Sequence, residues 1–503
     1  MAAREFDAVI VGGGHNGLVA AAYLSRAGRR VLLLERLGQV GGAAVSARLF
    51  DGVDARLSRY AYLVSLLPPR ILADLGASVR LAPRAYSSYT PDPATAGRTG
   101  LLVGRESTFG AIGASADERA FAEFYRRCQR VTQPLWPTLL EPLRTRSQAR
   151  ALIGDFWREM IEWPISAAIT TAFGNDVVRG VVATDALIGT FARLDDPSLH
   201  QNVCFLYHLL GGGDGGWHVP VGGMGAVSTA LAEAASGAEI VTGAEVYAID
   251  PSGEVRYRHR DGESVARGRF VLSGVTPTTL AGLLGEPAPP SAPGAQVKVN
   301  MVLSRLPRLR DPNVSPEQAF GGTFHVNETW TQLDAAYQQA AKSVLPQPLP
   351  CEIYCHSLAD PSILSPALRD SGAATLTVFG LHTPHAVFDK DALTEAVLAS
   401  LNSVLAEPIE DVLLADAHGT PCIETTTTAD LEQRLGMTGG NIFHGGLAWP
   451  FAEDDEPLDT PARRWGVATA HERILLCGAG ARRGGAVSGI GGHNAAMALL
   501  ETR

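Results

Sequence analysis

The feature that most constrains this chain is a glycine-rich turn between two apolar runs near its start, in FDAVIVGGGHNGLVAAAYLSRAGRRVLLLER. Residues 7–11 (DAVIV) are largely β-branched and apolar, which is typical of a strand buried on both faces. Gly12, Gly14 and Gly17 then give the spacing G-x-G-x-x-G, and a helical pattern follows. A second apolar run ends at Glu35. Strand, glycine turn, helix, strand and acid within about 30 residues predict a dinucleotide-binding βαβ unit.

Each part of this unit has a physical purpose. Gly12 permits the tight turn, Gly14 lets the backbone approach a pyrophosphate, and Gly17 lets the helix pack closely on the strand. The pyrophosphate is expected at the helix amino terminus, where unpaired N–H groups favour an anion. Glu35 lies 23 residues after Gly12, close to the offset at which an acid binds ribose hydroxyls. The fingerprint alone does not distinguish FAD from NAD, because both carry an ADP half.

A second glycine pair, Gly41–Gly42, follows Glu35 in the stretch RLGQVGGAAVS. Backbone without Cβ atoms at this point could lie against the extended remainder of a bound cofactor. The alternative interpretation of the pair is a surface turn. Near the other end of the chain, RILLC followed by Gly478, Gly480 and Gly484 has one residue too many for a second fingerprint. This segment predicts a strand, a turn and a helix that offers a second amino terminus to the same cofactor.

Four motifs together resemble the phytoene-desaturase-like FAD-dependent oxidoreductases, within the wider amine-oxidase-like flavoproteins. The motifs are VIVGGGHNGLVAAAYL, ERLGQVGGAAVS, WHVPVGGMGAVSTALAEAA and ILLCGAGARRGGAVSGIGGHNAAMAL, and they recur from end to end of the chain. The resemblance implies FAD as the cofactor. It also implies an α/β fold with a composite Rossmann-type FAD-binding domain and an interleaved α+β substrate domain.

The resemblance implies a set of cofactor contacts as well. The glycine turn would hold the pyrophosphate, Glu35 the adenosine ribose, and the main chain of Val246 the adenine. Gly41 and Gly42 would border the flavin side, and the carboxy-terminal segment would close over pyrophosphate and isoalloxazine. The full set is Gly12, Gly14, His15, Asn16, Gly17, Glu35, Arg36, Gly41, Gly42, Ala43, Val246, Gly478, Val487, Ser488 and Gly489.

One departure from the family pattern limits the transfer of a substrate. Many relatives carry a His-Pro pair where this chain has Arg482–Arg483. The two arginines could contact an anionic substrate or the pyrophosphate, and they could equally form a solvated turn.

Because the nucleotide-binding motifs lie at both ends and in the middle, we expect interleaved domains. Residues 76–210 are mostly helical by pattern, and Ser115 with Glu118 predicts a capping box at one helix start. Residues 285–294 form a proline-rich linker, and residues 296–306 and 373–384 predict strands of a separate sheet. The predicted division is 1–75, 216–290 and 440–503 for the FAD-binding domain, 76–215 for a helical cap, and 291–439 for the substrate domain.

Composition narrows the class of partner. A net charge of −10 argues against nucleic acid as a partner, because nothing would neutralise phosphates in bulk.

We find no leader pattern and no apolar stretch long enough to span a bilayer, so we expect a cytoplasmic protein, with peripheral membrane contact left open. Only three of the 42 basic residues are lysine, which is typical of a GC-rich bacterial genome. None of the six cysteines forms C-x-x-C, so no redox dithiol and no metal site are predicted.

Catalytic residues are hard to assign, because a flavin carries the hydride chemistry itself and no strong base is obligatory. The weak candidates are His444, His325 and His382, and a structural histidine is the favoured interpretation of each. No G-x-S-x-G motif is present, so hydrolysis is unsupported.

The predicted reaction is hydride transfer from a largely apolar small molecule to the flavin. We expect its pocket between the flavin and the second sheet, because residues 296–306 and 373–384 are mostly apolar. Dioxygen or a quinone would reoxidise the flavin, since a second fingerprint for a nicotinamide nucleotide is missing. Two alternatives stay open: an NAD(P)H-dependent flavin reductase or monooxygenase, and a flavoprotein whose FAD is structural and which acts through protein partners.

Overall fold

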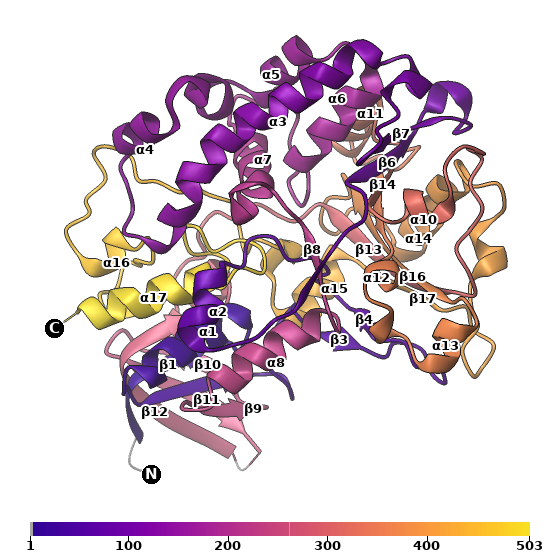
Figure 1. Ribbon diagram of the computed structural model, residues 1–503. Coiled ribbons are helices and arrows are strands. Elements are labelled where there is room, and N and C mark those ends of the chain that lie inside the picture. Colours follow the sequence, from indigo (N-terminus) through magenta and orange to yellow (C-terminus); the bar gives the residue numbers. More distant parts are fainter. Residues whose placement is uncertain (1–3, 261, 503) are drawn as a thin grey trace.

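The computed structural model describes residues 4–260 and 262–502. Two seven-stranded sheets and a layer of helices make up the molecule. Figure 1 shows the first sheet at the lower left together with both chain ends, the second sheet at the right, and helices α3 to α7 across the top. The α/β fold class is as the sequence predicts.

The first sheet is parallel at its centre, where β1 pairs with β12 on one side and β2 on the other. β9 extends the parallel part beyond β2, and β18 pairs with the end of β12. β10 and β11 continue the other edge as antiparallel strands. The bounds are β1 (Arg4–Val11), β2 (Val31–Glu35), β9 (Glu239–Thr242), β10 (Glu245–Ile249), β11 (Glu254–His259), β12 (Gly262–Ser273) and β18 (Ile474–Leu476).

Helices from distant parts of the chain cover this sheet. α1 (His15–Arg26) packs against α17 (Ile490–Glu501) and α8 (Met224–Ala234). The carboxy-terminal segment therefore forms the predicted strand, turn and helix, with β18 before the turn and α17 after it. Helices from both ends of the sequence, α1 and α17, therefore cover the first sheet together.

The second sheet has the order β17-β13-β16-β15-β14-β6-β7. β13 and β16, the two strands predicted from their apolar pattern, are antiparallel neighbours. β6 and β7 lie in the region that the sequence predicts to be mostly helical. They pair with each other as antiparallel strands, and β6 also pairs in parallel with β14, a contact that a local pattern does not reveal. The bounds are β6 (Ser88–Pro91), β7 (Gly100–Val103), β13 (Gln296–Leu303), β14 (Thr323–Val326), β15 (Cys351–Tyr354), β16 (Ala374–Leu381) and β17 (Ile423–Thr426).

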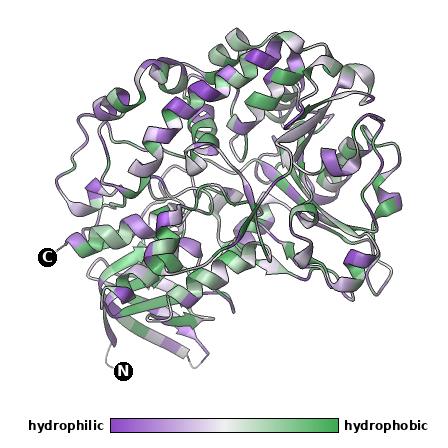
Figure 2. Ribbon diagram, viewed as in Figure 1, coloured by the Kyte–Doolittle hydropathy of each residue, from purple (hydrophilic) through white to green (hydrophobic). Residues whose placement is uncertain are grey.

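The helical layer is amphipathic. In its longest helix, α3 (Ser115–Leu135), the residues Phe124, Cys128, Val131 and Leu135 are buried at helical spacing. Figure 2 shows hydrophilic and hydrophobic residues alternating along these helices. The capping box predicted at Ser115 is wrong, because the helix begins at that residue and Ala114 occupies the N-cap without a side-chain hydrogen bond. The other helices are α4 (Arg146–Ile153), α5 (Ile165–Ala172), α6 (Asp176–Ala183) and α7 (His200–Leu210).

None of the described helices is long and apolar enough to cross a membrane. The remaining helices and strands complete the fold. They are α2 (Pro69–Leu75), α9 (Pro277–Leu284), α10 (Pro316–Ala319), α11 (Trp330–Ala340), α12 (His356–Ala359), α13 (Pro366–Asp370), α14 (Lys390–Asn402), α15 (Thr428–Leu435), α16 (Pro461–Arg464), β3 (Ser46–Ala47), β4 (Leu57–Ser58), β5 (Leu81–Pro83) and β8 (His218–Pro220).

Candidate active site

A cavity of about 780 Å³ begins at the carboxyl ends of β1 and β2 and extends to the second sheet and the helical layer. The carboxyl ends of parallel strands are where open α/β sheets bind ligands. One cavity therefore extends from the nucleotide turn to the second sheet.

The three fingerprint glycines have different surroundings. Gly12 has a φ of 102°, which a residue with a side chain rarely adopts. A Cβ on Gly17 would lie 2.2 Å from the carbonyl oxygen of Gly12, so only glycine lets helix and turn approach this closely. A Cβ on Gly14 would meet no protein atom closer than the Cα of Gly42, at 4.0 Å. The space in front of Gly14 belongs to the cavity, where a ligand could occupy it.

Helix α1 begins at this turn without a side-chain cap. Its N-cap is Gly14, so the first N–H groups of the helix receive no side-chain acceptor. Helix α17, in contrast, starts after Gly489, and its first N–H, that of Ile490, donates to the hydroxyl of Ser488 at 3.3 Å. An uncapped helix amino terminus at a cavity favours a phosphate.

Glu35 is held by backbone at the edge of the cavity. Its two carboxylate oxygens accept hydrogen bonds from the N–H groups of Gly13 and Leu37, each at 2.7 Å. The residue is 8% exposed and lines the cavity together with Arg36 and Val246. An oriented carboxylate here can bind the two hydroxyls of a ribose.

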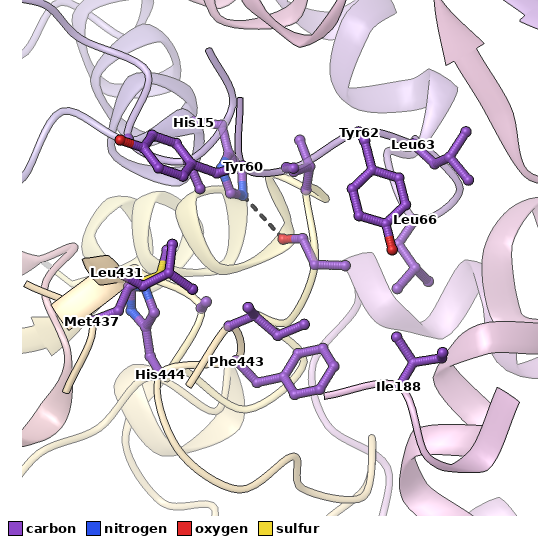
Figure 3. A pocket seen from close by; sticks show the side chains of 18 of the residues that line it. His15, Tyr60, Tyr62, Leu63, Leu66, Ile188, Leu431, Met437, Phe443 and His444 are labelled. Carbon is purple, nitrogen blue, oxygen red and sulfur yellow. Dashed lines mark hydrogen bonds between the residues drawn. The ribbon is translucent and has the colours of Figure 1, made fainter. Parts of the chain in front are cut away.

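The carboxy-terminal segment is joined to α1 by hydrogen bonds. His15 Nε2 lies 3.1 Å from the carbonyl oxygen of Ala486, the contact drawn in Figure 3, and Asn16 Nδ2 donates to Gly484 at 3.5 Å. Burial lowers the pKa of His15 to about 4, so its ring is neutral at pH 7. Gly478 and Val487 line the cavity beside this link.

Of the predicted cofactor residues, three do not line the cavity. These are Gly41, Ser488 and Gly489. The N–H of Gly41 donates to Gly13 at 2.8 Å, and a Cβ on Gly42 would lie 3.2 Å from the Cα of Gly14. The Gly41–Gly42 pair thus packs against the nucleotide turn, and the alternative of a surface turn is wrong.

Apolar side chains form the wall of the cavity opposite the glycine turn. They come from the segment after β4, from the helical layer and from the segment after α15. Figure 3 shows Tyr62, Leu66, Ile188 and Phe443 facing one another around this space, with His15 and His444 at its other side. The apolar lining of this part comprises Leu63, Leu66, Phe121, Val181, Ile188, Phe443 and Leu447.

The second sheet presents mostly polar side chains to the cavity, and Phe379 and Val103 are the apolar exceptions, so the apolar wall that the sequence predicts is present there only in small part. Along β13, Gln296 and Lys298 line the cavity, whereas Val297 and Val299 pack in the core on the other side of the sheet. A buried strand presents alternate residues to opposite faces, so the apolar majority of β13 points away from the ligand. The predicted apolar wall rested on the average composition of the strand, and that average includes the residues on the face that points away from the cavity.

Lys298 is the most notable residue that the sequence analysis missed. Its ammonium donates to the carbonyl of Ser58 at 2.5 Å and lies 5.0 Å from the centre of the Tyr62 ring. Burial lowers the pKa of Lys298 well below its usual range. The alternation of Gln296, Lys298 and Asn300 with apolar residues is the signal that could have found it. Other missed lining residues, without a local signal, are Arg84, Asp185, Glu352 and Tyr354.

The three candidate histidines fall in different places. His444 and His325 line the cavity, and burial lowers their pKa values to about 4 and about 3. His382 is not part of the lining and packs against the rings of Phe191 and Tyr337, with centroids 5.9 and 5.7 Å away. The structural interpretation therefore applies to His382.

Arg482 and Arg483 do not line this cavity, and they do not form a solvated turn. Arg483 is buried and donates to the carbonyls of Thr138, Glu141 and Trp465. Arg482 pairs with Glu456 at 2.9 Å. Arg483 joins the helical layer to the carboxy-terminal segment, so both interpretations are wrong for this residue. Arg482 is half-buried, and its side chain bonds Phe451 and Glu456 within the carboxy-terminal segment.

The fold and this site define a flavoprotein oxidoreductase, and FAD is its cofactor. The chain belongs to the family of flavin-containing amine oxidoreductases, which it matches over residues 17–419. It is 69% identical to an uncharacterized protein of Mycobacterium tuberculosis, over 99% of this chain and 97% of that protein. It is 31% identical to mouse pyridine nucleotide-disulfide oxidoreductase domain-containing protein 2, over 99% and 93%.

More remote comparisons agree on the fold. The chloroplastic prolycopene isomerase of Daucus carota is 22% identical over 83% of this chain and 69% of that protein. Among solved structures, putrescine oxidase bound to putrescine superposes with a TM-score of 0.58 at 15% identity, covering 99% and 98% of the two chains. Cyclohexylamine oxidase from Brevibacterium oxydans gives 0.58 at 14% identity, covering 98% of each.

Proposed function

We propose that this protein oxidises a small molecule with a largely apolar body by hydride transfer to FAD, and that dioxygen or a quinone then takes the electrons. The observation that carries the proposal is the apolar wall formed by residues such as Leu66, Ile188 and Phe443, which faces the glycine-lined end across one cavity. Ligand pockets with apolar walls and a few polar groups bind molecules of this kind. The similarity to an enzyme named for prolycopene adds support.

Bound FAD supplies the hydride acceptor. We assign the pyrophosphate to the uncapped start of α1 at Gly14, the ribose to Glu35, and the adenine to the main chain of Val246 on β10. Gly478 and Val487 would close over the cofactor from the carboxy-terminal segment. These residues fix the cofactor through backbone and one carboxylate, which leaves the opposite wall free to orient a substrate.

The choice of electron acceptor rests on what the chain offers to a nicotinamide nucleotide. The sequence holds one complete dinucleotide fingerprint, which the FAD site uses. All six cysteines are free and buried, and none is part of C-x-x-C, so no dithiol relay supports a disulfide-type reductase.

Anaerobic mixing of the FAD-loaded protein with candidate reductants tests the proposal. We expect NADH and NADPH to leave the flavin absorbance unchanged, and an apolar alcohol, alkene or amine from a metabolite panel to bleach it. Fast stoichiometric bleaching by NADPH would overturn it in favour of a reductase or monooxygenase. A flavin that no small reductant reaches would favour structural FAD.

A matched pair of variants tests the apolar wall. Ile188→Asp places a charge in that wall, so we expect bleaching by the apolar substrate to fall at least about tenfold while FAD stays bound, because an unpaired buried charge opposes substrate entry. Ile188→Leu conserves volume and serves as the control. Equal rates in the two variants would contradict a substrate contact at this wall.

A further inference from the structure

Three buried side chains that can ligate a metal converge at the polar end of the cavity. They are His325, Glu328 and Glu352, and one ligand atom from each lies within 4.8 Å of the other two. His325 on β14 and Glu352 on β15 are cross-strand partners. Glu328 follows β14 immediately after Asn327, whose φ of 59° turns the chain. Sheet pairing and one turn therefore bring together residues that the sequence separates.

Glu328 supplies an independent observation. The residue is fully buried, and neither of its carboxylate oxygens has a hydrogen-bond partner. A buried carboxylate without donors is strongly unfavourable unless a cation or a proton neutralises it. Its neighbours in the cluster are the ligand atoms of His325 and Glu352. An ionised Glu352 only accepts, and the neutral ring of His325 carries a single N–H, whose position depends on the tautomer.

The local charges leave room for a divalent cation. Glu328 and Glu352 are buried carboxyls, Asp185 is a half-buried one, and Arg84 is the basic group whose charge acts on Asp185 and Glu352. The guanidinium of Arg84 donates to neutral partners, the hydroxyl of Thr323 at 2.6 Å and the carbonyl of Trp217 at 3.3 Å. When the three carboxyls are ionised, they and Arg84 together carry a net charge of −2, which a divalent cation would neutralise.

Surrounding hydroxyls already orient two of the three side chains. Nδ1 of His325 lies 3.0 Å from the hydroxyl of Thr90. Glu352 accepts from the hydroxyls of Thr184, at 3.3 Å, and Tyr354. Metal-ligating histidines and carboxylates typically have such a second layer of partners, which fixes the direction of the ligand atoms.

We propose that His325, Glu328 and Glu352 bind a divalent transition-metal cation of the Zn²⁺ or Mn²⁺ class. One imidazole nitrogen with two carboxylates suits these ions, whereas Mg²⁺ and Ca²⁺ prefer oxygen ligands throughout. His325 and Glu352 line the cavity, so a remaining coordination position faces it and takes water or an oxygen atom of a bound molecule. No metal site was predicted from the cysteine pattern. That pattern cannot reveal this cluster, because the cluster uses no cysteine and its ligands have no short-range spacing in the sequence. The site does not depend on the proposed hydride transfer.

Metal content measured on the FAD-loaded protein tests the proposal. The protein is stripped with a chelator, equilibrated with ZnCl₂ or MnCl₂, passed over a sizing column and analysed by elemental mass spectrometry, with titration calorimetry for affinity. We expect one cation per chain for at least one of the two salts. A stoichiometry near zero for both salts would overturn the proposal.

Variants locate the cation. Glu328→Gln and His325→Asn should each weaken binding at least about tenfold. Glu395→Gln removes the same charge at an exposed position on α14 and should leave binding unchanged. Flavin absorbance and melting temperature report folding in each variant, and His325→Asn keeps the test decisive if Glu328→Gln does not fold. Equal affinity in His325→Asn and Glu395→Gln would place any bound ion elsewhere and overturn the assignment. A wild-type protein that binds no cation and is stabilised by Glu328→Gln would identify a proton-sharing carboxyl pair instead.

Discussion

The two ends of the cavity are built from different material. The end at β1 and β2 is formed largely by backbone, at Gly12, Gly14 and Gly42, with one oriented carboxylate from Glu35. The opposite end is formed by side chains, mostly polar on the second sheet and mostly apolar on the helical layer. A backbone surface suits a cofactor whose phosphates need N–H groups and close approach, whereas a side-chain surface can vary with the ligand.

Because of this difference, we expect the two ends of the cavity to respond differently to amino-acid substitutions. At the backbone end a single Cβ alters the surface, and the outcome depends on whether that Cβ meets protein or cavity. At the side-chain end a substitution changes one contact and leaves the scaffold in place. The following variants test this contrast, from the largest expected effect to the smallest.

Gly17→Ala should abolish folding. Its Cβ would lie 2.2 Å from the carbonyl oxygen of Gly12, a backbone atom that cannot move without displacing β1. We expect a cost above about 4 kcal/mol and no soluble FAD protein. Soluble yield and circular dichroism measure this. Gly282→Ala, on helix α9 with no atom within 4 Å of the added Cβ, is the control. A stable yellow Gly17→Ala protein would show that the turn and helix are less tightly packed.

Gly14→Val should fold and lose FAD. The added side chain enters cavity space, since no protein atom lies closer than 4.0 Å to its Cβ. We expect FAD affinity to fall at least about a hundredfold, which corresponds to about 2.7 kcal/mol. Flavin absorbance per protein and the melting temperature of the colourless product measure the two effects separately. Full flavin content in this variant would remove Gly14 from the pyrophosphate site.

His444→Asn should flatten the pH dependence of stability. Burial lowers the pKa of His444 from 6.5 to about 4, so the folded state holds the neutral ring. Stability is therefore present above pH 6.5 and is lost as the pH falls toward 4. The wild type should lose about 2 kcal/mol more than the variant between pH 7 and pH 5. Asparagine suits the φ of 61° at this position. Denaturant unfolding at both pH values is the measurement, and parallel losses would contradict the prediction.

Glu35→Gln should weaken FAD binding about tenfold, or about 1.4 kcal/mol. The amide keeps one acceptor for the N–H of Gly13 or Leu37 but cannot offer two carboxylate oxygens to a ribose. Equilibrium titration of the stripped protein with FAD measures the change. Glu395→Gln serves as the charge-matched control, and an unchanged dissociation constant for Glu35→Gln would exclude the ribose contact.

Most of the cavity end at β1 and β2 could be predicted from the sequence, because the geometry of that end is set by residues that are close together in the chain. The spacing of Gly12, Gly14 and Gly17 and the position of Glu35 follow from one strand, one turn and one helix. The same reasoning failed at Arg483, which looked like a ligand or surface residue and is held by the carbonyls of Thr138, Glu141 and Trp465. It also did not place β6 beside β14, because that parallel pairing joins segments that lie far apart in the sequence.

By itself, the sequence determined the nucleotide-binding unit, the interleaving of its segments and the family of the cofactor, because glycine spacing and buried strands record local backbone geometry. Only the tertiary structure decided which face of β13 meets the ligand, and it placed Lys298 there instead of valine. Only the tertiary structure brought His325, Glu328 and Glu352 within reach of one ion. Side chains from different strands become neighbours through sheet pairing and layer packing, and no short stretch of sequence encodes those distances.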